Sequence, residues 1–126
     1  DLTMLVAVLV LMQGAPLDCA DPYTQMAMSR CAVLEFQESD AELNAQWKLT
    51  AAEMKRRDAE PIDDGRPGYF ETLLAAQRAW IAYRDTHCTA EGYYARGGSM
   101  ESLLVSTCMT DLTKQRTRDL RDLITQ

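Results

Sequence analysis

The chain has 126 residues, of which 47% are hydrophobic and 25% charged, and its 13 basic and 19 acidic side chains give a net charge of −6. These values fit one globular domain and exclude a disordered acidic tail, a collagen-like repeat and a multidomain enzyme. The sequence has no stripe of basic residues that could bind phosphates, so nucleic acid is not expected as a partner. Its acidic balance disfavours a membrane-surface role and favours a cationic protein partner.

Residues 1–18 are predicted to be a signal-peptide-like segment. Residues 2–17 carry no charge, and residues 4–12 form an unbroken apolar run. The run is shorter than the roughly 20 residues needed to cross a membrane, and it fits the hydrophobic region of a secretory signal. No basic residue precedes the run, and Pro16 follows Ala15 at the expected cleavage point, so the alternative is a buried element of the mature fold. We expect no stable membrane insertion after signal removal, and Asp18 before Cys19 argues against a lipid anchor.

Residues 19–126 are predicted to form one all-α domain, a small bundle of about three long helices. Asp21 as N-cap and Pro22 at the first helical position start the first helix, which continues without Gly or Pro to about Glu60. Asp40 interrupts its apolar face, so a bend is expected near Ser39 and Asp40. The apolar face repeats at heptad spacing and comprises Met26, Val33, Phe36, Leu43, Trp47, Ala51 and Met54.

Two further helices follow connections rich in Gly and Pro. After a loop at 60–68, the second helix is expected from about Tyr69 to Ala90, and the third from an N-cap at Ser99 to about Ile124. The sequence shows no alternating strand pattern. The apolar stripes comprise Leu73, Leu74, Trp80, Ile81 and Cys88 in the second helix, and Leu103, Leu104, Cys108, Leu112, Leu120 and Leu123 in the third.

Four cysteines in a small chain behind a signal-like run indicate two disulfides. Cys88 and Cys108 lie about ten residues on either side of the turn at 97–98, so they would face each other in an antiparallel helix pair. This favours Cys88–Cys108 and leaves Cys19–Cys31, although four cysteines allow three connectivities. His87 is the only histidine and no Cys-x-x-Cys pair occurs, so no metal site is expected.

Three groups of residues together resemble one known family. They are residues 24–31 with 40–44, residues 76–85 ending in Cys88, and residues 97–99 with Cys108, 112–113, Arg116 and Leu120. The chain resembles the LprI-like family of bacterial envelope proteins, named for a lysozyme inhibitor, over nearly all of residues 19–126. It departs at residues 26–28, where the family tends to have a Glu and an Asn, and in lacking a lipid-attachment motif. The resemblance implies a periplasmic or secreted, disulfide-bonded helical module that binds and inhibits a lysozyme-type (muramidase) enzyme.

Eight polar residues lie on or beside the apolar stripes. Buried polar groups need partners, and Arg with Asp forms charge-assisted pairs, so we expect a structural network that fixes the helix register. The alternative is a polar pocket for a glycan or peptide. The eight residues are Gln25, Asp40, Asn44, Gln77, Arg78, Arg84, Asp85 and Arg116.

A partner surface is predicted from charge and exposure. An acidic inhibitor is steered toward a basic enzyme, and the acidic runs at 35–42 and 58–64 could dock on such an enzyme. The alternative is that the first run is a solvated helix face and the second a polar loop. Lysozymes cleave their substrate with two carboxylates in a cleft. An arginine beside a protruding turn, such as Arg96, could enter the cleft and pair with these carboxylates. For Gly97 and Ser99 the alternative is ordinary turn and cap chemistry. The residues expected to contact the partner are Arg96, Ser99, Glu35, Glu38, Glu42, Tyr93 and Tyr94.

An enzyme is not expected. The sequence contains no Gly-x-Ser-x-Gly, phosphate loop or metal pattern, and two disulfides leave no thiol nucleophile. We therefore predict no catalytic residues and no cofactor. The alternative function is an immunity or envelope scaffold protein that uses the same surfaces without inhibiting a host lysozyme.

Overall fold

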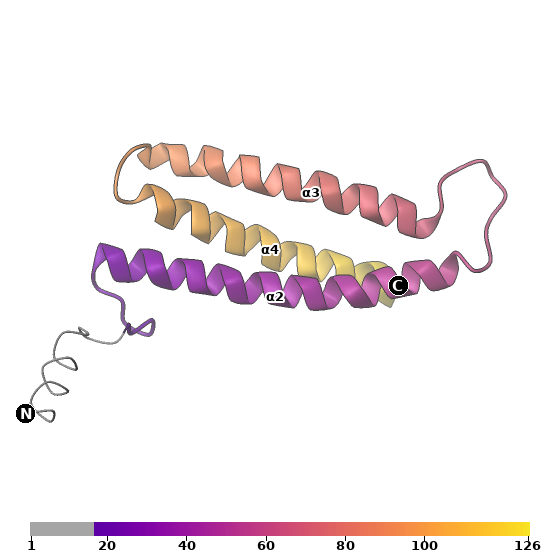
Figure 1. The fold of residues 1–126 in the computed structure, drawn as a ribbon, viewed down its shortest axis with the longest axis horizontal. Helices are drawn as coiled ribbons and strands as arrows, with labels where there is room; N and C mark the ends of the chain where they lie inside the picture. Colours follow the sequence, from indigo (N-terminus) through magenta and orange to yellow (C-terminus); the bar gives the residue numbers. More distant parts are fainter. Residues whose placement is uncertain (1–16) are drawn as a thin grey trace, which may run out of the picture.

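A computed structural model describes residues 17–126, and the apolar run expected to act as a signal lies outside the described residues. Three helices form the fold (Figure 1): α2 spans Gln25–Arg57, α3 Tyr69–Gly92 and α4 Glu101–Thr125, with a short 3-10 helix, η1, at Tyr93–Ala95. No strand occurs between residues 17 and 126, which confirms the all-α prediction. No helix in this part is long and apolar enough to cross a membrane.

The three helices lie along one another in an elongated bundle (Figure 1). The α2–α3 loop and the C terminus lie at one end, and the α3–α4 connection and the start of α2 lie at the other. The last helix, α4, packs against both earlier ones, most extensively against α2, whereas α2 and α3 contact each other least. The central helix of the fold is therefore the last one in the sequence.

The first helix begins later than predicted. Its N-cap is Thr24, whose Oγ1 accepts a hydrogen bond from the Ala27 N–H at 3.1 Å, so Asp21 and Pro22 precede the helix. Thr24 has the extended backbone that an N-cap requires. The helix continues without a break through residues 39–40 to a basic last turn, which suits the negative end of its dipole. The expected bend therefore does not interrupt its hydrogen bonding.

Side-chain acceptors outside the predicted caps bind the N–H groups at or before the starts of the other two helices. Asp58 accepts hydrogen bonds from the N–H groups of Tyr69 and Phe70, at 2.7 and 3.0 Å, and thus caps α3 from the preceding loop. Ser99 is not an N-cap: α4 starts after Met100, which makes no side-chain capping bond. Instead, Oε1 of Glu101, the first residue of α4, accepts a hydrogen bond from the N–H of residue 97 at 3.2 Å and so stabilises the turn before the helix.

The apolar core is narrower than the predicted stripes. Met26 is 83% exposed, because at 100° per residue it stands roughly 100° around α2 from the buried Leu43. Ile81 of α3 is 40% exposed, since α3 packs mainly against one neighbour and part of its predicted face stays open. Leu123 is 41% exposed in the last turn of α4, at the end of the bundle. The buried apolar cluster is Leu43, Ala51, Met54, Leu73 and Leu120, with Trp47, Phe70, Trp80 and Ile124 packed against it.

Candidate functional site

Two disulfides fix one end of the bundle. Cys88–Cys108 joins α3 to α4, and Cys19–Cys31 joins the segment before α2 to its second turn, with Cα–Cα distances of 5.4 and 5.5 Å. Both predicted pairings are confirmed. Cys88 is fully buried and Cys108 nearly so, so their bond lies inside the bundle just below the α3–α4 connection.

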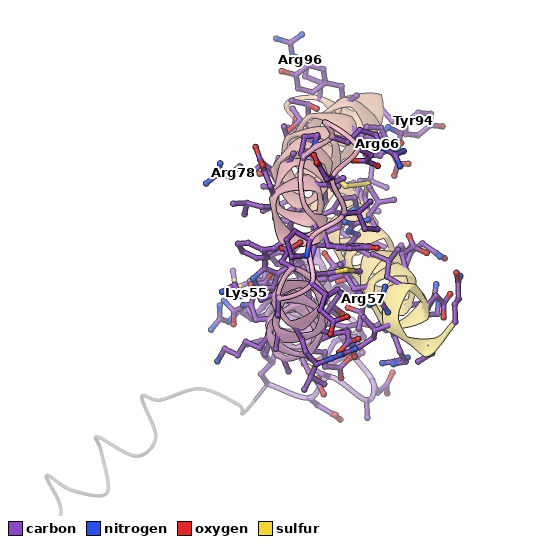
Figure 2. The ribbon with its side chains drawn as sticks, turned by 90° about the vertical axis from the view of Figure 1, so that its right-hand side faces the viewer. Lys55, Arg57, Arg66, Arg78, Tyr94 and Arg96 are labelled. Atoms are coloured by element: carbon purple, nitrogen blue, oxygen red, sulfur yellow. A yellow bond between two sulfur atoms is a disulfide. The ribbon has the colours of Figure 1, made fainter. Side chains whose placement is uncertain are left out.

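That connection forms an exposed tip, defined here as residues 93–99. Tyr94 is 94% exposed and Tyr93 49% exposed. The Arg96 guanidinium lies 4.4 Å from the centre of the Tyr93 ring, and Figure 2 shows that Arg96 and Tyr94 project away from the bundle. Within residues 17–126, Arg96 has no carboxylate at ion-pair distance. The tip thus presents two tyrosines and an uncompensated cation on a turn that one disulfide anchors.

Local geometry holds the tip in one shape. The chain turns at Gly97, whose φ of 79° lies in the left-handed region that favours glycine. Gly92 lies where α3 meets α4, and a Cβ on it would stand 2.5 Å from Cγ2 of Val105. Ser99 is exposed in the same turn. Two glycines therefore allow the close helix contact and the sharp reversal that make the tip protrude.

The predicted acidic residues form a separate surface, defined here as the acidic face and made of Glu35, Glu38 and Glu42. Their spacing of three and four places them on one side of α2, and all three are exposed. Glu35 pairs with Lys114 of α4, Nζ to Oε1 at 3.2 Å, while Glu38 and Glu42 make no ion pair within the described residues. No hydrogen bond or ion pair in this part of the chain joins the acidic face to the tip. The two surfaces belong to different elements.

Arg84 is a buried cation whose polar partners come from all three helices and include two partly exposed carboxylates. Its side chain is 10% exposed, and Nη1 donates to Oγ1 of Thr113 at 3.3 Å. The same guanidinium lies 3.6 Å from Oδ1 of Asp40 on α2 and 3.0 Å from Oδ1 of Asp85. It also lies near two aromatic rings, 5.3 Å from Phe36 and 5.0 Å from Trp80. One side chain of α3 therefore contacts both other helices.

A second arginine extends the polar interior toward the other end of the bundle. Nε of Arg116 donates to Oε1 of Gln77 at 2.9 Å, and the guanidinium lies 5.9 Å from the Trp80 ring. Its Nη2 is buried and has no hydrogen-bond partner among the described residues. Burial lowers the pKa of Arg116 from its ordinary value, and the nearby Asp119 charge opposes that shift. Arg116 is thus a half-buried cation without an ion-pair partner in this part of the chain.

The remaining three polar residues singled out from the sequence lie elsewhere. Gln25 donates to the hydroxyl of Ser29 at 3.0 Å within the first turns of α2. Asn44 and Arg78 are exposed, and Figure 2 shows Arg78 pointing away from the bundle. The structure therefore brings together five of the eight residues, around Arg84 and around Arg116.

Sequence reasoning missed a set of small buried polar residues. Thr50 is fully buried: its Oγ1 accepts from Nε2 of Gln46 at 3.2 Å and donates to the Leu120 carbonyl at 2.9 Å. Their spacing could have predicted this burial, because residues 43, 46, 50 and 54 follow one another at intervals of three and four, which place them on one face of a helix. The missed residues are Ser39, Gln46, Thr50, Thr110, Thr113 and Thr117.

One cluster contains potential metal ligands. Ligand atoms of His87, Glu91 and Cys108 lie within 4.8 Å of one another. The Cys108 sulfur is bonded to Cys88, however, and His87 Nε2 already contacts Glu91 Oε1 at 3.2 Å. Two available side chains are fewer than the three or four that protein zinc sites use.

A family model described as "Lysozyme inhibitor LprI" matches residues 18–120. The chain belongs to the LprI family. A curated relative, an uncharacterized protein of Rhizobium meliloti (strain 1021), is 45% identical over 109 residues, covering 85% of this chain and 78% of that protein. No solved structure matches the chain. The LprI family is described by inhibition rather than catalysis, which agrees with a protein that is not an enzyme.

Proposed function

We propose that this protein binds and inhibits a lysozyme-type cell-wall hydrolase in the periplasm or outside the cell. The observation that carries the proposal is the LprI family match over residues 18–120. The two disulfides support the location, because such bonds persist in oxidising compartments and are rare in the cytosol.

The tip is the surface best suited to a carboxylate-lined cleft. Lysozyme-type enzymes place two carboxyl groups on either side of the scissile bond, at the base of a groove. A convex, disulfide-anchored turn fits such a groove, and the Arg96 guanidinium matches a carboxylate in charge and hydrogen-bond geometry. Tyr and Arg are also the residues that most often dominate binding energy at protein interfaces. We infer that Arg96, with Tyr93 and Tyr94, makes the central contact.

The acidic face serves the approach rather than the central contact. Glu38 and Glu42 are exposed and unpaired within residues 17–126, in a chain with a net charge of −6. Such charges raise the association rate with a basic enzyme, and added salt screens their effect. Glu35 contributes less, because Lys114 already neutralises part of its charge.

The test is a lysozyme activity assay with purified, oxidised protein against several lysozyme types at low and high salt. We expect dose-dependent inhibition that weakens with salt. Arg96→Ala is expected to weaken inhibition roughly 30-fold, the size of an interface hot spot. Arg78→Ala is the matched control, since it removes an exposed arginine of α3 far from the tip. Glu38→Lys with Glu42→Lys is expected to slow association and reduce its salt dependence.

Two results would count against this proposal. Equal inhibition by the Arg96 and Arg78 variants would remove the tip from the interface. Absence of inhibition for every lysozyme type at high micromolar protein would refute host-lysozyme inhibition and favour an immunity or envelope scaffold role.

A further inference from the structure

A groove lies at the end of the bundle opposite the tip. It has a volume of about 720 Å³ and runs between the α2–α3 loop, the start of α3 and the end of α4. This volume is in the range of small-molecule sites, roughly 300–1,000 Å³. We call it the loop groove; its walls include Met54, Ile62, Tyr69, Leu73, Leu123 and Arg116.

The walls of the loop groove are mostly apolar and partly open. Ile62 is 62% exposed, Tyr69 40% and Leu123 41%, so three large apolar side chains from three elements meet water around one hollow. Exposed apolar groups gathered around one concavity are typical of a ligand site, whereas scattered ones need no explanation.

One cation in the wall of the loop groove has no ion-pair partner. The walls carry two carboxylates, Asp58 and Asp64, and two arginines, and of these arginines Arg116 is half-buried and makes no ion pair within residues 17–126. Asp64 pairs with Arg66 at 2.6 Å, Asp58 accepts bonds from the first N–H groups of α3 at the positive end of the helix dipole, and Asp119, whose charge acts on Arg116, accepts a bond from Gln115. Figure 2 looks onto this end of the bundle, where Lys55 and Arg57 also lie; Arg57 pairs with Glu53 at 3.1 Å, and Lys55 stands 4.5 Å from the centre of the Phe70 ring. An anionic head group would compensate the Arg116 charge without displacing an existing ion pair.

We propose that the loop groove binds a single-chain fatty acid anion, with its acyl chain along the apolar wall and its carboxylate toward Arg116. The groove favours an acyl chain over a peptide. A peptide brings a backbone N–H and C=O at every residue, each of which needs a partner once buried. The wall offers few free polar groups, since Asp58 and Asp64 are occupied and the loop contributes Pro61 and Pro67, which have no N–H. An acyl chain needs a polar partner only at its head.

The test is calorimetric titration of the oxidised full chain with sodium laurate below its micellar concentration. We expect one site, and binding roughly tenfold weaker or more for decanoate, which lacks two methylenes worth about fourfold each. Dodecyltrimethylammonium, with the same chain and the opposite charge, is expected not to compete with laurate. Arg116→Gln is expected to weaken laurate binding about tenfold, and Arg116→Lys to retain most of it.

Matched variants separate the loop groove from the rest of the surface. Ala76 lines the groove and Ala75 does not, and both are exposed on α3. Ala76→Phe is therefore expected to block laurate, whereas Ala75→Phe is not, and neither change depends on removing a buried charge. The site is independent of the tip, so Arg96→Ala should leave laurate binding unchanged.

Three outcomes would overturn the proposal. They are laurate binding that survives Ala76→Phe, equal binding of the cationic amphiphile, and tighter binding of an acetylated tetraleucine peptide with a free carboxylate than of laurate. The last of these would assign the groove to a protein C terminus.

Discussion

The hydroxyl of Thr50 gives the sharpest test of the polar interior. Thr50→Val keeps the shape of the side chain but removes the group that accepts from Gln46 and donates to the Leu120 carbonyl, at 3.2 and 2.9 Å. Thr50 and Leu120 are fully buried and Gln46 is 8% exposed, so water cannot readily replace the lost partner. A buried donor or acceptor left unsatisfied costs about 1–3 kcal/mol. We expect a loss of about 2 kcal/mol in the free energy of unfolding, and a fall in Tm of about 10 °C.

Urea unfolding followed by far-ultraviolet circular dichroism, with both disulfides intact, measures this loss. Thr89→Val is the matched control: Thr89 is exposed and its hydroxyl donates to the carbonyl of residue 85 in its own helix at 2.8 Å. Its expected effect is within about 0.5 kcal/mol. Adding Gln46→Leu to Thr50→Val removes the orphaned amide, so the double variant should lose less than the sum of the single losses. Equal effects at residues 50 and 89 would refute the reasoning.

Three further predictions concern the ends of the helices and the disulfide near the N-terminal end of α2. Asp58→Ala removes the acceptor for the first N–H groups of α3 and should lower the free energy of unfolding by about 1 kcal/mol in urea; an unchanged value would contradict this and show that water caps the helix equally well. Hydrogen bonds from Arg56 and then Arg57 lower the pKa of Glu53 from 4.5 to about 2, so its contribution is present above pH 4.5 and is lost as pH falls toward 2. Glu53→Gln should flatten the stability profile in that window, and an unchanged acid limb contradicts this. Cys19→Ser with Cys31→Ser should cost about 3 kcal/mol by calorimetry, and a loss below about 1 kcal/mol would show that this loop adds little.

The disulfide pairing could be predicted because it depends on symmetry about a turn. Cys88 and Cys108 stand at nearly equal distances from residues 97–98, and any tight antiparallel helix pair brings such positions together. The helix starts were less predictable. Asp21 and Thr24 both suit an N-cap, and Ser99 suits one better than Met100, so residue type alone does not decide between them, and local geometry such as the bond from residue 97 to Glu101 does.

The polar interior could be predicted only in part. Arg84 and Gln77 attract notice because charged and amide groups are unusual on an apolar stripe. A threonine does not, yet its hydroxyl can bond to its own helix, as Thr117 does to the Thr113 carbonyl at 3.0 Å, so that burying it costs little. Hydrophobic patterning therefore missed the buried threonines of α4, Thr110, Thr113 and Thr117. The loop groove could not be predicted either, because its walls join residues 54–76 to Arg116 and Leu123 of α4, which are distant in the sequence.

The position of α4 affects when the chain can fold during synthesis. The Thr50 hydroxyl bonds to the Leu120 carbonyl, 70 residues later, and α2 finds most of its packing partners on that last helix. A partial chain that stops before α4 leaves most of the inner face of α2 uncovered, because α3 contacts α2 only slightly. The native core can therefore close only after α4 has emerged. Until then the apolar face of α2 is exposed, and chaperones and proteases can bind the unfolded chain.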